Sequence, residues 1–74
     1  MAEIALRSEV AGTVWKIAKG VGARVERDEA VLVLESMKME IPVEAPAAGT
    51  VKALLVQEGD PVREAQPVAV LTTD

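Results

Sequence analysis

The sequence predicts an all-β domain, a sandwich or barrel, and three observations lead to this fold class. Valine is the most frequent large apolar residue and Trp15 is the only aromatic one; stiff β-branched side chains favour strands. Short apolar runs alternate with turn residues, which indicates about eight short strands. Sliding the chain along itself by 37 residues, half of its 74-residue length, aligns eleven identical residues without a gap. One motif used twice predicts a domain with pseudo-twofold symmetry.

The repeat fixes which parts of the chain are equivalent. Ala11–Val14 falls on Ala48–Val51. Lys38 falls on Met1, so the middle of the chain and its two ends are expected at equivalent places on opposite sides of one body. Four turn or strand-start glycines also coincide in pairs and are expected to take backbone shapes that a side chain would hinder. They are Gly12, Gly22, Gly49 and Gly59.

Each extended segment is bounded by Gly, Pro or charged turn residues. The expected strands, in chain order, are Glu3–Arg7, Gly12–Ala18, Arg24–Glu26, Ala30–Glu35, Glu40–Glu44, Thr50–Val56, Val62–Arg63 and Val68–Thr72. The turns between them hold Gly20 and Gly22, Arg27–Glu29, Pro46–Gly49, Glu58–Pro61 and Gln66–Pro67. Gly and Pro interrupt every window long enough for a helix.

Two positions are more specific. The apolar run Val31–Leu34 predicts a strand covered on both faces, although periodicity alone leaves a buried helical segment open. Pro42 has no N–H to donate to a sheet and is therefore expected at a sheet edge.

Composition narrows the classes of function. A chain of 74 residues is expected to be a single domain spanning residues 1–74. It has no Cys and no His, so disulfides, thiolate nucleophiles and imidazole bases are excluded. Eight basic residues are scattered among twelve acidic ones, which disfavours nucleic-acid binding. No membrane-length apolar run or targeting signal is found, which predicts a cytoplasmic protein without a membrane partner.

The hexapeptide Glu35–Glu40 lies at the junction of the two halves. Its flanking strands predict a hairpin whose tip is Ser36–Met39. The tip lacks the usual Asn-Gly turn and instead places Lys38 between Met37 and Met39. Flexible, polarizable methionine suits a surface that other proteins grip. The alternative is that both methionines pack onto the body and Lys38 is an ordinary turn lysine; the midpoint location and the full hexapeptide favour an amine offered for modification.

Three further side chains have two interpretations each. Glu35 and Glu40 either pair with basic groups on a partner or serve as solubilising charges. Trp15 aligns with Lys52 in the repeat, so its site need not be deeply buried. A partly exposed packing residue is the favoured interpretation of Trp15, and a partner contact is the alternative.

At these residues the chain resembles the biotinyl/lipoyl carrier domains, and most closely the stand-alone biotin/lipoyl attachment proteins of the biotin carboxyl carrier type. Met37-Lys38-Met39 is similar to the biotin-attachment motif, Ala45–Val51 to the segment that follows the biotinyl hairpin, and Glu58–Val62 to a second glycine turn. The resemblance covers nearly the whole chain. It implies a flattened barrel of two four-stranded antiparallel sheets with a quasi-twofold axis, a barrel-sandwich hybrid.

The resemblance also implies a function. A solvated lysine is almost wholly protonated at neutral pH and does not acylate itself, so a biotin protein ligase would attach biotin to Lys38. The chain would then carry carboxyl groups between a biotin carboxylase and a carboxyltransferase. It would be a non-catalytic carrier and a monomer in isolation. Met37 and Met39 would contact the ligase and the partners, and Glu35, Ser36 and Glu40 would contribute more weakly.

Two departures from the family pattern leave alternatives open. Many biotin domains have Ala before Met-Lys-Met, whereas Glu35-Ser36 is more familiar from lipoyl domains. Lipoate, or both modifications, therefore stays possible at Lys38. The second departure concerns the protruding thumb insertion that some bacterial biotin carrier domains have near their first half. The two halves of this chain align without a gap, so this insertion is absent. An unmodified β domain that only binds other proteins is the alternative from a different class.

Overall fold

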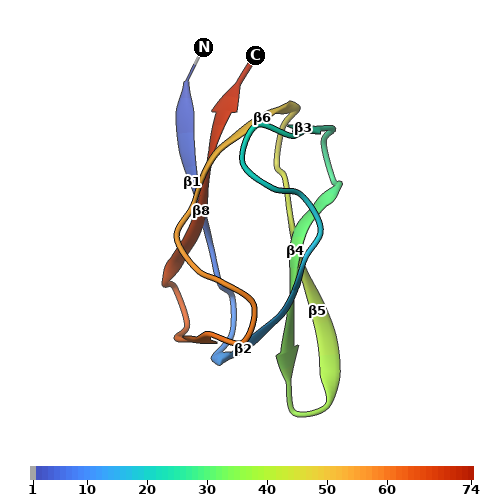
Figure 1. The fold of residues 1–74 in the computed structure, drawn as a ribbon, viewed down its shortest axis with the longest axis vertical. Helices are drawn as coiled ribbons and strands as arrows, with labels where there is room; N and C mark the ends of the chain where they lie inside the picture. The colour runs from blue at the N-terminus through green and yellow to red at the C-terminus, as the bar shows by residue number, and fades with distance from the viewer. Residues whose placement is uncertain (1) are drawn as a thin grey trace.

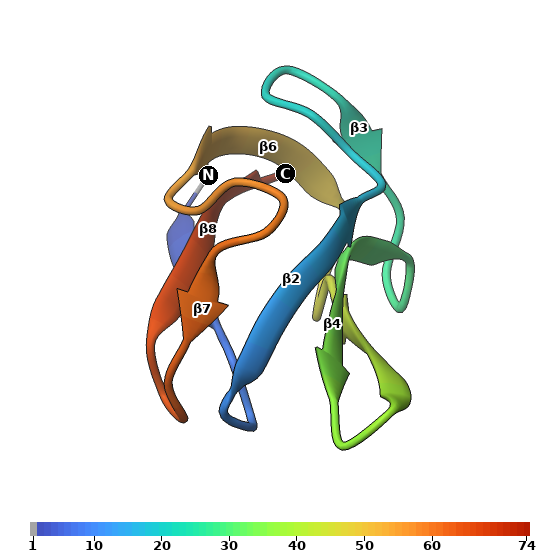
Figure 2. The same cartoon turned by 60° about the horizontal axis from the view of Figure 1, so that its bottom comes forward.

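The computed structural model describes residues 2–74 and is all-β, which confirms the expected fold class. The strands are β1 (Glu3–Arg7), β2 (Gly12–Ile17), β3 (Arg24–Val25), β4 (Ala30–Ser36), β5 (Met39–Glu44), β6 (Gly49–Leu54), β7 (Pro61–Val62) and β8 (Pro67–Thr73). They form two four-stranded antiparallel sheets, in the orders β1-β8-β6-β3 and β5-β4-β2-β7. The two sheets wrap around one core (Figures 1 and 2).

Several strand limits differ slightly from expectation. β2 and β6 end at Ile17 and Leu54, before the expected Ala18 and Val56. Pro61, expected in a turn, instead begins β7 and pairs with Thr13. Pro42 lies in β5, an edge strand of its sheet, as expected for a residue without an N–H.

The internal repeat is visible in the strand order, because β1, β2, β3 and β4 correspond to β5, β6, β7 and β8. That correspondence turns the order of one sheet into the order of the other. The hydrogen bonds repeat as well: the Gly22 amide donates to the Val51 carbonyl at 2.8 Å, and the Gly59 amide donates to the Val14 carbonyl at 2.7 Å. Both glycines have φ near +90°, a conformation that other residues rarely adopt.

Each half also has an equivalent β-bulge, between Val14 and Lys16 in β2 and between Val51 and Ala53 in β6. The bulged residues are Trp15 and Lys52. Both point to the outside, and Trp15 keeps 50% of its surface exposed. The expectation of a partly exposed Trp15 is therefore confirmed.

The core consists of small and medium aliphatic side chains contributed equally by both sheets. Val31, Leu32 and Leu34 of β4 are fully buried, while Val33 is only half-buried on the outer face, so the run is not covered completely on both sides. The buried apolar residues are Leu6, Val14, Val25, Val31, Leu32, Leu34, Val43, Ala45, Val51, Val56, Val62, Val68, Ala69 and Leu71. Close packing of such residues gives a rigid support for the turns at either end.

The molecule is elongated, with extents of 35 × 17 × 17 Å. The chain ends lie at one end of the long axis and the β4–β5 turn at the other (Figure 1). This arrangement agrees with the expected equivalence of the centre and the ends, although Met1 itself lies outside the described residues. Within residues 2–74 no helix is long and apolar enough to cross a membrane.

Candidate attachment site

The β4–β5 hairpin ends in a turn of two residues, Met37 and Lys38. Ser36 pairs with Met39 across it, so the expected four-residue tip is corrected to a two-residue turn. Met37 has φ of 52° and Lys38 has φ of 66°. Two successive residues in the left-handed region match the twist of a tight hairpin, for which Asn-Gly is the usual choice. Neither Met nor Lys prefers this conformation, so strand pairing on both sides imposes it.

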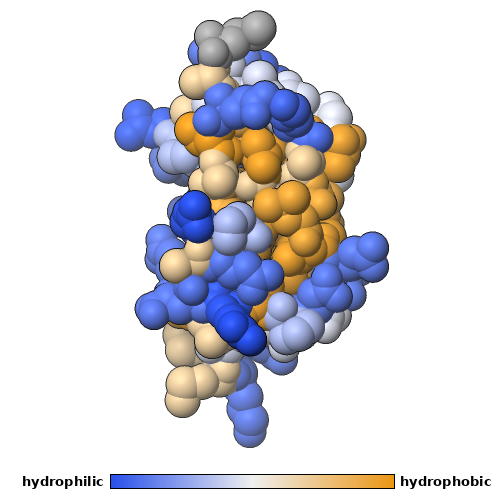
Figure 3. Space-filling model, turned by 90° about the vertical axis from the view of Figure 1, so that its left-hand side faces the viewer, coloured by the Kyte–Doolittle hydropathy of each residue, from blue (hydrophilic) through white to orange (hydrophobic). Residues whose placement is uncertain are grey.

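The side chains at the tip are exposed. Met37 has 92% of its surface accessible, Met39 has 65%, and Lys38 is exposed as well. Within residues 2–74 no ion pair involves the Lys38 ammonium. The methionines do not pack onto the body, which rules out the alternative of a covered tip. The hairpin end of the molecule projects away from the body in Figure 3.

The base of the hairpin is fixed to the start of β2. The Ser36 hydroxyl donates a hydrogen bond of 2.9 Å to the Ala11 carbonyl. A Cβ placed on Gly12 would lie 2.4 Å from the Glu35 carbonyl oxygen, so only glycine allows this close approach of β2 to β4. Lys38 therefore sits on a support whose position is set by backbone contacts.

The flanking acids lie on the outer face of the hairpin. Glu35 and Glu40 are exposed and pair directly across the two strands. Sequence reasoning named both residues but did not anticipate that they oppose each other. It also missed the Ala11 carbonyl as the acceptor for Ser36; the hydroxyl in place of the usual Ala was the available signal.

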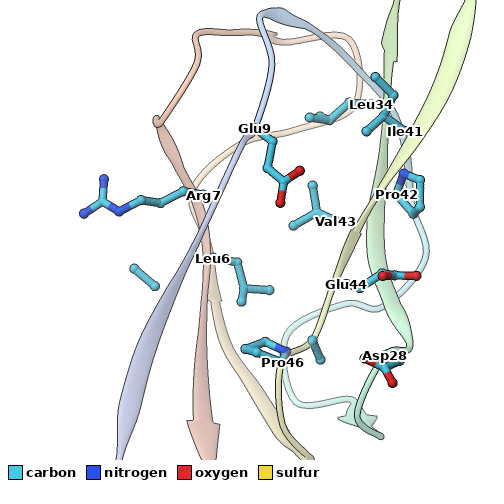
Figure 4. A pocket seen from close by; sticks show the side chains of 12 residues that line it. Leu6, Arg7, Glu9, Asp28, Leu34, Ile41, Pro42, Val43, Glu44 and Pro46 are labelled. Carbon is cyan, nitrogen blue, oxygen red and sulfur yellow. The ribbon is translucent and has the colours of Figure 1, made fainter.

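A surface groove lies elsewhere on the described chain. It has a volume of about 360 Å³ and runs between the edge strands β1 and β5. Leu6 and Val43, which are equivalent in the repeat, face each other across it, and the Arg7 side chain points away from it (Figure 4). None of residues 35–40 lines this groove. The groove is present because the edge strands β1 and β5 are not hydrogen-bonded to each other. It brings none of the predicted site residues together.

Within residues 2–74 no group of three or more Asp, Glu, His or Cys side chains is placed to hold a metal ion. The chemistry that the hairpin itself supports is that of an acceptor: an exposed amine at a rigid tip, bordered by two adaptable apolar side chains. An amine of this kind fits the covalent attachment of an acyl group by a second protein.

Comparison with known proteins gives the family of the chain. A family model described as "Biotin-requiring enzyme" matches residues 2–71. The chain is 45% identical over 56 residues to the biotin/lipoyl attachment protein of Bacillus subtilis, covering 76% of this chain and 77% of that one. The chain belongs to the biotin/lipoyl attachment family. Domains of this family are carrier modules, not catalysts, and they attach biotin or lipoate covalently.

The chain resembles solved structures of both a carboxylase and a lipoyl domain. Part of the urea carboxylase of Kluyveromyces lactis superimposes with a TM-score of 0.92 and 36% identity, over 97% of this chain and 6% of that one. The lipoyl domain of the 2-oxoglutarate dehydrogenase complex of Azotobacter vinelandii superimposes with a TM-score of 0.72 and 33% identity, over 85% of this chain and 80% of that one. Both neighbours support the flattened barrel of two four-stranded sheets.

Proposed function

We propose that the chain is a biotin carboxyl carrier whose attachment point is Lys38. The observation that carries the proposal is the exposed Lys38 amine at the two-residue turn, flanked by the exposed Met37 and Met39. Likeness to a carboxylase domain at 36% identity supports biotin as the attached group. We further propose that the partners are a biotin protein ligase, a biotin carboxylase and a carboxyltransferase, and that the carrier is a cytoplasmic monomer.

The role of Lys38 in the attachment step is that of an acceptor. The ligase brings the biotinyl group as a mixed anhydride with AMP. The ε-nitrogen loses its proton to a base on the ligase or in solvent and forms an amide bond with the acyl carbon, while the bond to AMP breaks and AMP leaves. Met37 and Met39 give the ligase apolar contacts on both sides of the amine.

The rest of the chain controls where the amine is presented. Ser36 and Gly12 hold the hairpin against β2, so Lys38 stands at a constant height above the barrel. When attached, biotin supplies a ureido nitrogen that accepts and releases a carboxyl group. Tethering keeps this group near both partner active sites at a high effective concentration, and the partners provide the catalytic residues.

A lipoyl carrier is the second candidate, since Glu35-Ser36 is similar to the lipoyl pattern and the chain is 33% identical to a lipoyl domain. Intact mass of the protein isolated from its own host distinguishes the two, because biotinyl and lipoyl groups add different masses. We expect a biotinyl adduct that is lost in Lys38→Arg, with an unchanged β-rich circular dichroism spectrum. A Lys38→Arg protein that still gained biotin would refute the assignment of Lys38, and a protein that no ligase modifies would favour the unmodified interaction module.

A further inference from the structure

The outer face of the sheet that carries the Lys38 hairpin has an unusual composition. Strand register places Thr13, Glu35 and Glu40 in one row and Val33 and Pro42 in the next. Side chains paired across neighbouring strands project from the same face of a sheet. The residues between these rows, including Leu34, point into the core, so both rows face solvent.

Trp15 belongs to this outer face because of the β-bulge in β2. The bulge sets both Trp15 and Lys16 opposite Val33, and both are exposed. The exposed indole therefore lies beside the two rows described above. We call the surface formed by Trp15, Glu35 and Glu40 the Trp15 face.

The internal repeat supplies a matched surface on the other sheet. There Lys52 takes the place of Trp15, Glu3 takes the place of Glu40, and the neutral Thr72 takes the place of Glu35. The Lys52 ammonium forms an ion pair with the Glu3 carboxylate. This equivalent surface thus neutralises its own acidic residue within the fold.

The Trp15 face has no such internal partner. Trp15 replaces the lysine, and within residues 2–74 no ion pair neutralises Glu35 or Glu40. Their strand positions are directly opposite, an arrangement in which like charges destabilise a sheet. Two uncompensated carboxylates thus lie on β4 and β5, the strands that lead to Lys38, and an exposed indole lies on the neighbouring strand β2.

We propose that the Trp15 face docks the ligase that modifies Lys38, through an arginine or lysine on the ligase that stacks on the Trp15 indole and pairs with Glu35 and Glu40. This inference rests on the proposed function. A cation over an indole face and charge-assisted bonds to carboxylates reinforce each other when one basic side chain makes both. The face is continuous with the tip that the ligase must reach, so one contact surface covers both.

The test measures binding of the host's biotin protein ligase to carriers in a Lys38→Arg background, by calorimetry at low and high salt. KM and kcat for biotin attachment are measured in parallel with the Lys38 forms. The variants are Trp15→Lys, Trp15→Ala and the double change Glu35→Gln/Glu40→Gln. The controls on the equivalent surface of the other sheet are Lys52→Ala and Glu3→Gln.

We expect Trp15→Ala to weaken ligase binding about tenfold, as for a central aromatic contact. The double glutamine variant should weaken binding about fivefold and remove most of its salt dependence. Trp15→Lys should weaken binding at least as much as Trp15→Ala while keeping or raising the melting temperature, because the new ammonium can pair with Glu40 as Lys52 pairs with Glu3. KM should rise in all three with kcat nearly unchanged, and the controls should bind like the parent.

Two failures are distinguishable. If the unaltered carrier gains no biotin from the ligase, the proposed function fails. If it gains biotin but the three variants bind the ligase as the parent does, only the docking surface is wrong. A fall in melting temperature for Trp15→Lys, in step with weaker binding, would assign Trp15 a structural role and overturn the proposal as well.

Discussion

Replacing Gly12 by alanine should force the Lys38 hairpin away from β2. The new Cβ would lie 2.4 Å from the Glu35 carbonyl oxygen and 3.3 Å from the Ser36 Cβ. Ordinary contact begins near 3.4 Å, so the two strands must separate by about 1 Å. Overpacking of this kind costs about 1–3 kcal/mol. For a domain of this size a loss of about 2 kcal/mol lowers Tm by roughly 8–16 °C.

Two other glycines give matched controls. Gly49, the repeat equivalent of Gly12, would place a Cβ 2.3 Å from the Thr72 carbonyl oxygen, so Gly49→Ala should lower Tm by a similar amount. That contact lies far from Lys38. Gly20 has no atom within 4 Å of an added Cβ, so Gly20→Ala should leave Tm near that of the parent.

The assay combines thermal unfolding by circular dichroism with the rate of biotin attachment well below every Tm. Gly12→Ala and Gly49→Ala should share the loss of stability, whereas only Gly12→Ala should also raise KM for the ligase, because it displaces the hairpin. A Tm for Gly12→Ala indistinguishable from that of Gly20→Ala would refute the packing argument. An equal effect of the two destabilising changes on KM would refute the link to the hairpin.

Three further changes test the site and its support. Ser36→Ala removes the hydrogen bond to β2 and should reduce the free energy of unfolding by about 0.5–1.5 kcal/mol, measured by urea denaturation, while Lys38 still accepts biotin. Met37→Asn should stabilise the turn by about 1 kcal/mol, because Asn tolerates a positive φ, and should raise KM for the ligase; lower stability would contradict the strain assigned to Met37. A hydrogen bond from the Glu26 amide, 2.9 Å long, lowers the pKa of the Glu29 carboxyl, with help from a nearby lysine. Because the pKa of Glu29 is lower in the folded than in the unfolded chain, its carboxylate stabilises the fold at pH values above the unfolded pKa. This stabilisation is lost as pH falls through the folded pKa, so the free energy of unfolding should drop below about pH 4. Glu29→Gln should flatten this part of the pH profile of urea unfolding, and an unaltered profile would count against the role of Glu29.

Much of the fold could be predicted because the two halves carry the same local signals. Turn glycines and valine runs recur at a fixed spacing, and each expected strand is present within about two residues of its limits. The exposed position of Lys38 at the end of a hairpin could be predicted because the hexapeptide at the junction is both a motif and the symmetry-related counterpart of the chain ends. These features depend on neighbours in sequence, which the sequence contains.

Features that depend on contacts between distant segments could not be predicted. Strict alternation along β2 from the buried Val14 would place Lys16 in the core and Ile17 outside. The bulge reverses this: Lys16 is exposed and Ile17 packs against the core. Because side chains in a strand alternate with a period of two, one extra residue changes the face of everything beyond it.

By itself the sequence determined the duplication, the all-β class and the lysine that the hairpin presents. Only the tertiary structure decided that the tip has two residues, that Ser36 is tied to Ala11, and that Glu35 and Glu40 oppose each other on the side where Trp15 is exposed. The physical reason is that strand pairing between segments up to dozens of residues apart fixes register, and register alone selects which side chains meet on a face.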